Sequence, residues 1–145
     1  MPTPYFNPDC ITWLRFGEVE PPIHYRILQI DEAQRIADVI FKFPARDSII
    51  LHRHKAPNHT FVVQGEHHLY EPDGSLREVR PTGSYTVSPA SESPHREGGG
   101  QEDVVVLFSM RPGEDNLLYE LLDNDQNPVG VVTFGMLREL YKVQG

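Results

Sequence analysis

Short runs of alternating apolar and polar residues, separated by turn-forming residues, make up most of the chain. Thirteen prolines and eleven glycines punctuate segments that are rich in β-branched and aromatic residues. Alternation over four to eight residues is typical of a strand with one buried face, and such strands at regular spacing predict an all-β sandwich or barrel. The predicted strands are 11–16, 23–30, 39–44, 48–54, two within 60–74 on either side of Gly65, 75–80, 84–89, 104–110, 117–123 and 129–134.

Two segments carry apolar residues at helical spacing. Residues 31–40 taken alone predict a helix with Asp31 as its cap, but in an all-β context 31–34 would form a hairpin turn, which is the interpretation we adopt. Residues 135–144 place four apolar side chains on one stripe and predict a short C-terminal helix. The segment 90–103, with three successive glycines, is expected to be a polar loop.

Length and charge narrow the functional classes. The 145 residues contain no repeat and no linker, which predicts one domain over 1–145 with a proline-rich arm at about 1–20. A formal charge of −8 argues against nucleic-acid and anionic-membrane partners. The single Cys10 excludes an intrachain disulfide, and the N-terminus lacks the pattern of a signal peptide, so we expect a cytoplasmic protein.

Histidines concentrate in the segment LHRHKAPNH at 51–59. Because side chains alternate along a strand, His52 and His54 should point the same way, and two buried imidazoles need a partner such as a divalent metal. His59 and His95 are the candidates for further ligands. Spacing alone also allows a polar surface pair. His67 and His68 are adjacent and face opposite sides, so we leave them out of the site.

Two segments resemble the sequence motifs of the cupin superfamily. HRHKAPNHTFVVQG at 52–65 is similar to the first cupin motif, which spans 46–65 here, and GSYTVSPASESPH at 83–95 is similar to the second. The resemblance implies a jelly-roll β-barrel that holds one metal, with His52, His54 and His95 as ligands. Its departures are Arg46 for a glycine, one extra residue before the second-motif histidine, and Ser91 for another glycine.

The position of the first-motif glutamate is the departure with the most consequence. His59 occupies it, so by resemblance His59 is either a fourth ligand or a group behind the ligands. A set of three histidines without glutamate is similar to that of acetylacetone-cleaving dioxygenases. Trp13, the H-R-H form and the tail at 121–141 also resemble this group and the related ChrR-like proteins.

That resemblance implies metal-dependent cleavage of a carbon–carbon bond in a small β-diketone, with Fe(II) as the metal and Zn(II) or Ni(II) as alternatives. The same fold also allows a zinc-dependent hydrolase, or a non-catalytic metal-binding or small-molecule-binding module of the ChrR-like sensor type. Phe61, Tyr70 and Tyr85 are the candidate lining of the substrate pocket. We expect a small-molecule substrate and a homodimer or larger oligomer, to which the N-terminal arm could add an edge strand.

Overall fold

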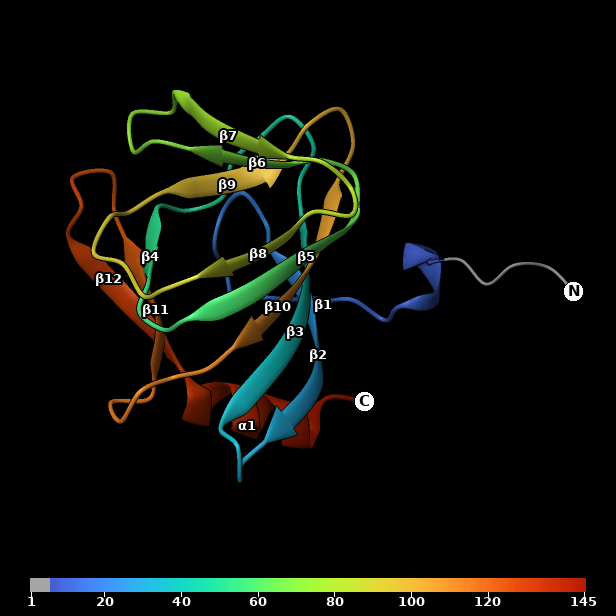
Figure 1. Cartoon of the computed structure of the whole chain (residues 1–145), viewed down its shortest axis with the longest axis vertical. Coiled ribbons are helices and arrows are strands. Elements are labelled where there is room, and N and C mark those ends of the chain that lie inside the picture. Colours follow the sequence, from blue (N-terminus) through green and yellow to red (C-terminus); the bar gives the residue numbers. More distant parts are fainter. Residues whose placement is uncertain (1–5) are drawn as a thin grey trace, which may run out of the picture.

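Two β-walls enclose the core in the computed structural model, which describes residues 6–145 (Figure 1). The elements in chain order are η1 (Pro8–Cys10), β1 (Leu14–Arg15), β2 (His24–Asp31), β3 (Ile36–Phe43), β4 (His52–His54), β5 (Asn58–Gln64), β6 (His67–Tyr70), β7 (Leu76–Arg80), β8 (Tyr85–Ser88), β9 (Arg96–Gly99), β10 (Val104–Met110), β11 (Leu117–Leu122), β12 (Pro128–Thr133) and α1 (Phe134–Val143). The prediction of an all-β fold with one C-terminal helix is confirmed.

The first wall is a six-stranded antiparallel sheet, and the second is formed by two smaller sheets that meet at a seam. The strand order of the first wall is β1-β2-β3-β10-β5-β8, and the smaller sheets are β12-β11-β4 and β7-β6-β9. At the seam, His52 and His95 form an isolated antiparallel bridge, with backbone hydrogen bonds of 3.1 and 2.9 Å between them. The seam therefore brings the two histidine-bearing motifs side by side.

Apolar side chains from both walls fill the space between them. Phe41 and Phe108 meet edge to face with their ring centroids 5.2 Å apart, and the valines of β10 are fully buried. Helix α1 closes one end of the barrel (Figure 1), where Phe134 and Leu137 are buried. Burial of this apolar surface is the main stabilising contribution in such a fold. None of the helices in the described part of the chain has the length and apolar character needed to cross a membrane.

The hairpin between β2 and β3 confirms the interpretation of residues 31–34 as a turn. The strands on either side pair antiparallel up to Asp31 and Ile36, and Arg35 takes the left-handed conformation with φ of 56°. The side chain of Asp31 accepts a hydrogen bond from the backbone N–H of Gln34, which is a turn contact rather than a helix cap. Tertiary pairing thus overrides the local helical spacing of the segment.

The segment expected to be a polar loop contains strand β9. Gly98 and Gly99 are buried, and a Cβ built on Gly98 would lie 1.8 Å from the backbone oxygen of Asp47. The glycines here permit close approach of two backbones, so a composition typical of loops forms a buried strand. This strand carries Glu97 into the barrel.

The N-terminal arm is only partly described, because residues 1–5 of the predicted 1–20 lie outside the described residues. Within it, Leu14–Arg15 pairs with β2 of the same chain. That segment is therefore used inside the barrel's own first wall, and the predicted oligomer remains a prediction.

Candidate metal centre

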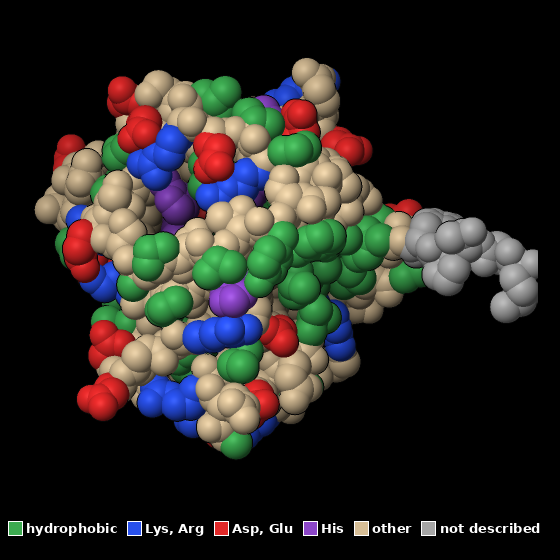
Figure 2. Space-filling model, viewed as in Figure 1, with side chains coloured by type: hydrophobic (Ala, Val, Ile, Leu, Met, Phe, Trp, Pro, Cys, Tyr) green, Lys and Arg blue, Asp and Glu red, His purple; other side chains and the backbone are tan. Residues whose placement is uncertain are grey.

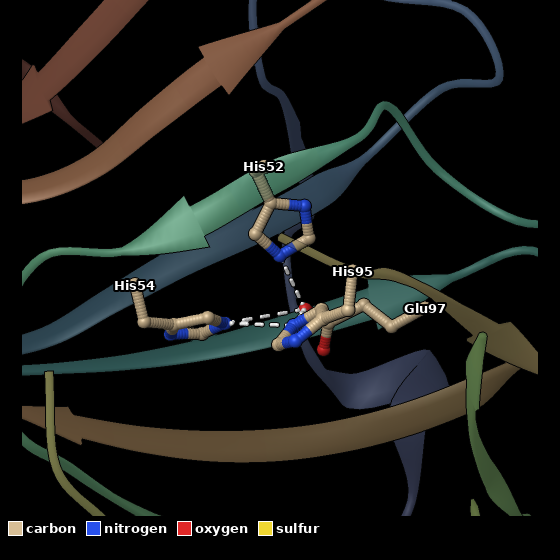
Figure 3. Close-up of side chains that lie close together, drawn as sticks. All are labelled: His52, His54, His95 and Glu97. Carbon is tan, nitrogen blue, oxygen red and sulfur yellow. Dashed lines mark hydrogen bonds and ion pairs between the residues drawn. The ribbon is translucent and has the colours of Figure 1, made fainter. Parts of the chain in front are cut away.

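Three imidazoles and one carboxylate converge at the seam of the second wall. His52 and His54 extend from β4, His95 directly precedes β9, and Glu97 lies on β9 (Figure 3). One potential ligand atom from each residue lies within 4.8 Å of all the others. The Nε2 atoms of His52, His95 and His54 lie 2.6, 3.2 and 3.5 Å from the same Oε2 atom of Glu97.

The protonation of His52 indicates that a positive charge belongs at this point. Its Nδ1 lies 2.8 Å from the carbonyl oxygen of Ile50, which can only accept, so Nδ1 carries the proton. The Nε2 of a neutral His52 then presents a lone pair to the Glu97 carboxylate at 2.6 Å. Two acceptors at that distance require a proton or another cation between them.

Burial and the histidines act in opposite directions on the charge of Glu97. Its burial raises the pKa, but the hydrogen bonds with His52, His54, His67 and His95 outweigh that effect and hold the pKa of Glu97 well below its usual value. Burial lowers the pKa of His54 to about 4 and also lowers that of His95. The centre thus combines an ionised carboxylate with two imidazoles, those of His54 and His95, whose neutral forms are favoured.

These four residues fit a divalent transition metal. Metal–nitrogen and metal–oxygen bonds of about 2.0–2.2 Å place neighbouring ligand atoms about 3–4 Å apart, close to the separations found here. The Nε2 atoms of His54 and His95 face each other at 3.1 Å, a contact that a shared cation satisfies directly. Imidazole and carboxylate donors suit zinc, iron, nickel and copper.

His67 supports the carboxylate from behind. Its Nε2 lies 2.6 Å from Oε1 of Glu97, the oxygen that does not face the three imidazoles. The ring is buried, with Phe43 stacked 6.0 Å away between centroids, and its Nδ1 has no hydrogen-bond partner. A histidine that donates to a ligating carboxylate fixes its orientation. His67 was not among the residues expected in the site, although its adjacency to His68 implied that at most one of the two could face inward.

His59 lies outside the cluster, against the prediction from the position of the motif. Its Nδ1 lies 2.6 Å from the hydroxyl of Tyr85, on the outer face of β5 and β8. Asn58, one residue earlier, is buried, and its side-chain amide lies 3.0 Å from Nδ1 of His54. With three intervening residues instead of four, Asn58 occupies the glutamate position of the motif and faces inward.

Two of the three residues expected in the substrate pocket also face outward. Phe61 and Tyr85 are cross-strand partners on the outer face and are 40% and 61% exposed. Figure 2 shows a continuous apolar patch on this side of the molecule. The third, Tyr70, is half-buried with its hydroxyl 3.3 Å from His68, which is also not part of the cluster. None of the three lines a cavity beside the metal ligands.

Two cavities border the cluster instead. The first cavity reaches His52 and Glu97, and its other lining residues are apolar apart from Tyr119. The pKa of Tyr119 is raised well above its usual value by burial and by the charge of Glu97. The second cavity reaches His54, His95 and Glu97. It is lined by more polar side chains: Asn58, Thr60, His67, Arg80, Ser88, Ser91 and Ser93. A bound metal would therefore be accessible to a small molecule from the second cavity.

The fold resembles several solved structures at low sequence identity. An RmlC-like cupin protein from Ralstonia eutropha JMP134 superposes with a TM-score of 0.73 at 18% identity, over 98% of this chain and 86% of that one. A putative acetylacetone dioxygenase from Methylibium petroleiphilum PM1 gives 0.69 at 16% identity, over 97% and 95%. An acetylacetone dioxygenase from Acinetobacter johnsonii gives 0.63 at 14% identity, over 100% and 95%.

At these identities the structural likeness establishes the fold and not the reaction. No curated protein matches the sequence. A family model, the ChrR cupin-like domain, does match, over residues 3–113 and so over most of the chain. The match includes both histidine motifs and Glu97. On this evidence the chain belongs to the ChrR cupin-like family.

Proposed function

We propose that the protein is a metal-dependent enzyme that cleaves a carbon–carbon bond in a small β-dicarbonyl compound, with Fe(II) as its metal. The proposal rests on the convergence of three imidazoles around one oxygen of Glu97, next to a cavity that twelve residues line. Two solved cupins of similar fold are described as acetylacetone dioxygenases or putative ones, which supports this substrate class.

His52, His54, His95 and Glu97 would hold the metal. The chemistry that a divalent metal supplies there is that of a Lewis acid, which binds both oxygens of a β-dicarbonyl and stabilises its enolate. The chain itself sets the charge, because the Glu97 carboxylate leaves a divalent ion with one net positive charge, equal and opposite to that of an enolate. The carbonyl of Ile50 accepts a hydrogen bond from Nδ1–H of His52 and so leaves the Nε2 lone pair available for a metal that these four residues would hold.

Glu97 changes the reasoning about the reaction type. Oxidative cleavage was expected from a set of three histidines without glutamate, but the carboxylate of Glu97 lies among the three imidazoles. Three nitrogens and one oxygen are also a set that zinc accepts, which makes hydrolytic cleavage the second candidate. Oxygen consumption separates the two, since oxidative cleavage incorporates O₂ whereas hydrolysis adds water.

The test follows the ultraviolet absorbance of acetylacetone with protein reconstituted with Fe(II) or Zn(II), in air and under nitrogen. Loss of absorbance only in air, with one O₂ consumed per diketone, supports the dioxygenase. Loss with zinc under nitrogen supports the hydrolase. His52→Ala should abolish either activity, and His59→Ala, on the outer face, is the matched histidine control. Stoichiometric metal with no loss of any β-dicarbonyl would overturn the proposal in favour of a metal-binding sensor module.

A further inference from the structure

The cluster separates two cavities of different character. The first cavity is enclosed by aromatic and aliphatic side chains from both walls and from α1. The second opens among hydroxyl, amide and imidazole groups and contains one permanently charged cation, Arg80. A ligand whose two oxygens bind at the cluster would therefore extend toward Arg80 on the side of the second cavity.

Strand pairing places Arg80 next to the centre. Arg80 on β7 lies directly opposite His67 on β6, and paired residues project from the same face of a sheet. His67 is itself hydrogen-bonded to Glu97, so only the side chain of His67 lies between Arg80 and the candidate metal ligands along this face of the sheet. Figure 2 shows a hollow above β8 in which a histidine is visible between Lys or Arg side chains.

The side chain of Arg80 is largely buried, but its guanidinium has only a weak ion pair with Glu78. Its side chain is 14% exposed, and Nη2 and Nε lie 3.1 and 3.2 Å from one carboxylate oxygen of Glu78. Glu78 is 49% exposed at the edge strand of its sheet, where an ion pair contributes little. Two of the guanidinium's donors can therefore exchange this partner for an anion in the cavity.

Charge at the centre explains why a second cation matters. A divalent metal together with Glu97 is balanced by an enolate alone, so a neutral diketone such as acetylacetone makes no use of Arg80. A dicarbonyl compound that also carries a carboxylate brings one further negative charge. Arginine binds carboxylates through paired N–H donors, and such charge-assisted bonds are stronger than neutral ones.

We propose that Arg80 is a specificity-determining residue that binds the carboxylate of a β-dicarbonyl acid, with the dicarbonyl oxygens at the cluster. The preferred substrate class is then that of 2,4-dioxo acids and other β-diketones that carry a separate carboxylate. This inference rests on the proposed function, because it assigns the substrate of the same site. The hydroxyls of Thr60 and Ser88 line the same cavity and add neutral donors.

The test compares binding of 2,4-dioxopentanoate and acetylacetone to the zinc-loaded protein under nitrogen. Enolate absorbance recorded by stopped flow reports binding before turnover. We expect the acid to bind about 10- to 100-fold more tightly than acetylacetone, the range of one charge-assisted contact. Arg80→Met should remove that preference and leave acetylacetone binding unchanged. Glu78→Gln should increase it, because the guanidinium loses its competing carboxylate.

Arg138→Met on α1 is the control, since Arg138 lies on the surface helix and lines neither cavity beside the cluster. Equal affinity for the two diketones, an equal loss for both in Arg80→Met, or binding of neither would overturn the assignment. Arg80-dependent binding without subsequent loss of substrate in air or under nitrogen would sustain the subsite and overturn only the proposed reaction.

Discussion

The cluster histidines of β4 and His59 of β5 lie in strands that are consecutive in the chain, yet their environments are opposite. His52 and His54 are buried around Glu97, whereas His59 bonds to Tyr85 on the outer face. The difference follows from parity, because the even-numbered positions 52, 54, 56, 58 and 60 are all buried. Within β5 the side chains of Asn58 and Thr60 are buried, so that of His59 between them faces outward. Strand parity is thus a stricter guide to ligands than distance along a motif.

Removing a ligand should produce the largest contrast between the two regions. We expect His52→Ala to lower metal affinity by more than about 100-fold, because even groups behind the ligands contribute about 10- to 100-fold. Elemental analysis of the purified protein gives the metal content, and circular dichroism verifies the fold. Full metal occupancy in this variant would mean that the cluster is not the metal site.

A group behind the ligands should have a smaller effect. His67→Phe removes the contact to Oε1 of Glu97 while keeping an aromatic ring against Phe43, and we expect metal affinity to fall about 10- to 100-fold. Chelator competition measures the affinity. The matched control is His68→Phe, the next residue, whose Nε2 contacts the surface Glu66 instead. Equal effects of the two variants would show that His67 does not orient Glu97.

Acid should weaken the metal-free protein through the cluster and not through the outer face. The pKa of His54 is about 4 in the folded protein against 6.5 for an exposed histidine. Between these values the unfolded chain binds more protons, so the free energy of unfolding decreases as pH falls from about 6.5 to 4. Urea unfolding across that window measures it. His54→Gln should flatten the dependence, and an unchanged slope in that variant would exclude this assignment.

The smallest effect is expected on the outer face. His59→Ala removes the contact with Tyr85, which is partly exposed, and we expect a change in unfolding free energy within about 0.5 kcal/mol and unchanged metal content. Thermal unfolding and elemental analysis provide the two readings. A loss of metal here would restore His59 as a ligand and contradict the parity argument.

Much of the fold could be predicted from the sequence because its strands alternate clearly and end at turn residues. The strand at 104–110 has the predicted bounds, and the C-terminal helix is displaced by a single residue. Strand β9 was not predictable from composition, because Arg-Glu-Gly-Gly has neither β-branched nor aromatic residues. It is a strand because its backbone pairs with β6, a segment far away in sequence, and its glycines leave room for the backbone of Asp47.

The candidate site was predictable where the signal was local. The H-x-H spacing places His52 and His54 on one face, and the second motif supplies His95. Glu97 follows His95 by two residues, so a strand over this segment would place both side chains on the same face. Glu97 was missed because no strand was predicted there. Arg80 gave no local signal, since its position beside the cavity arises only from pairing between β6 and β7.

The single bridge between His52 and His95 has a consequence for how the barrel is completed. Backbone hydrogen bonds from Ile49 to Glu97 and from Ser91 to His54 flank this bridge, so the residues that carry the ligand atoms lie in the middle of the join between the two small sheets. An ion bound there would link the two small sheets through its coordination bonds, although their strands are far apart in the sequence. Closure of the wall and metal binding would then be thermodynamically coupled. Hydrogen exchange at the backbone amides of His52 and His95 should slow as the ion binds.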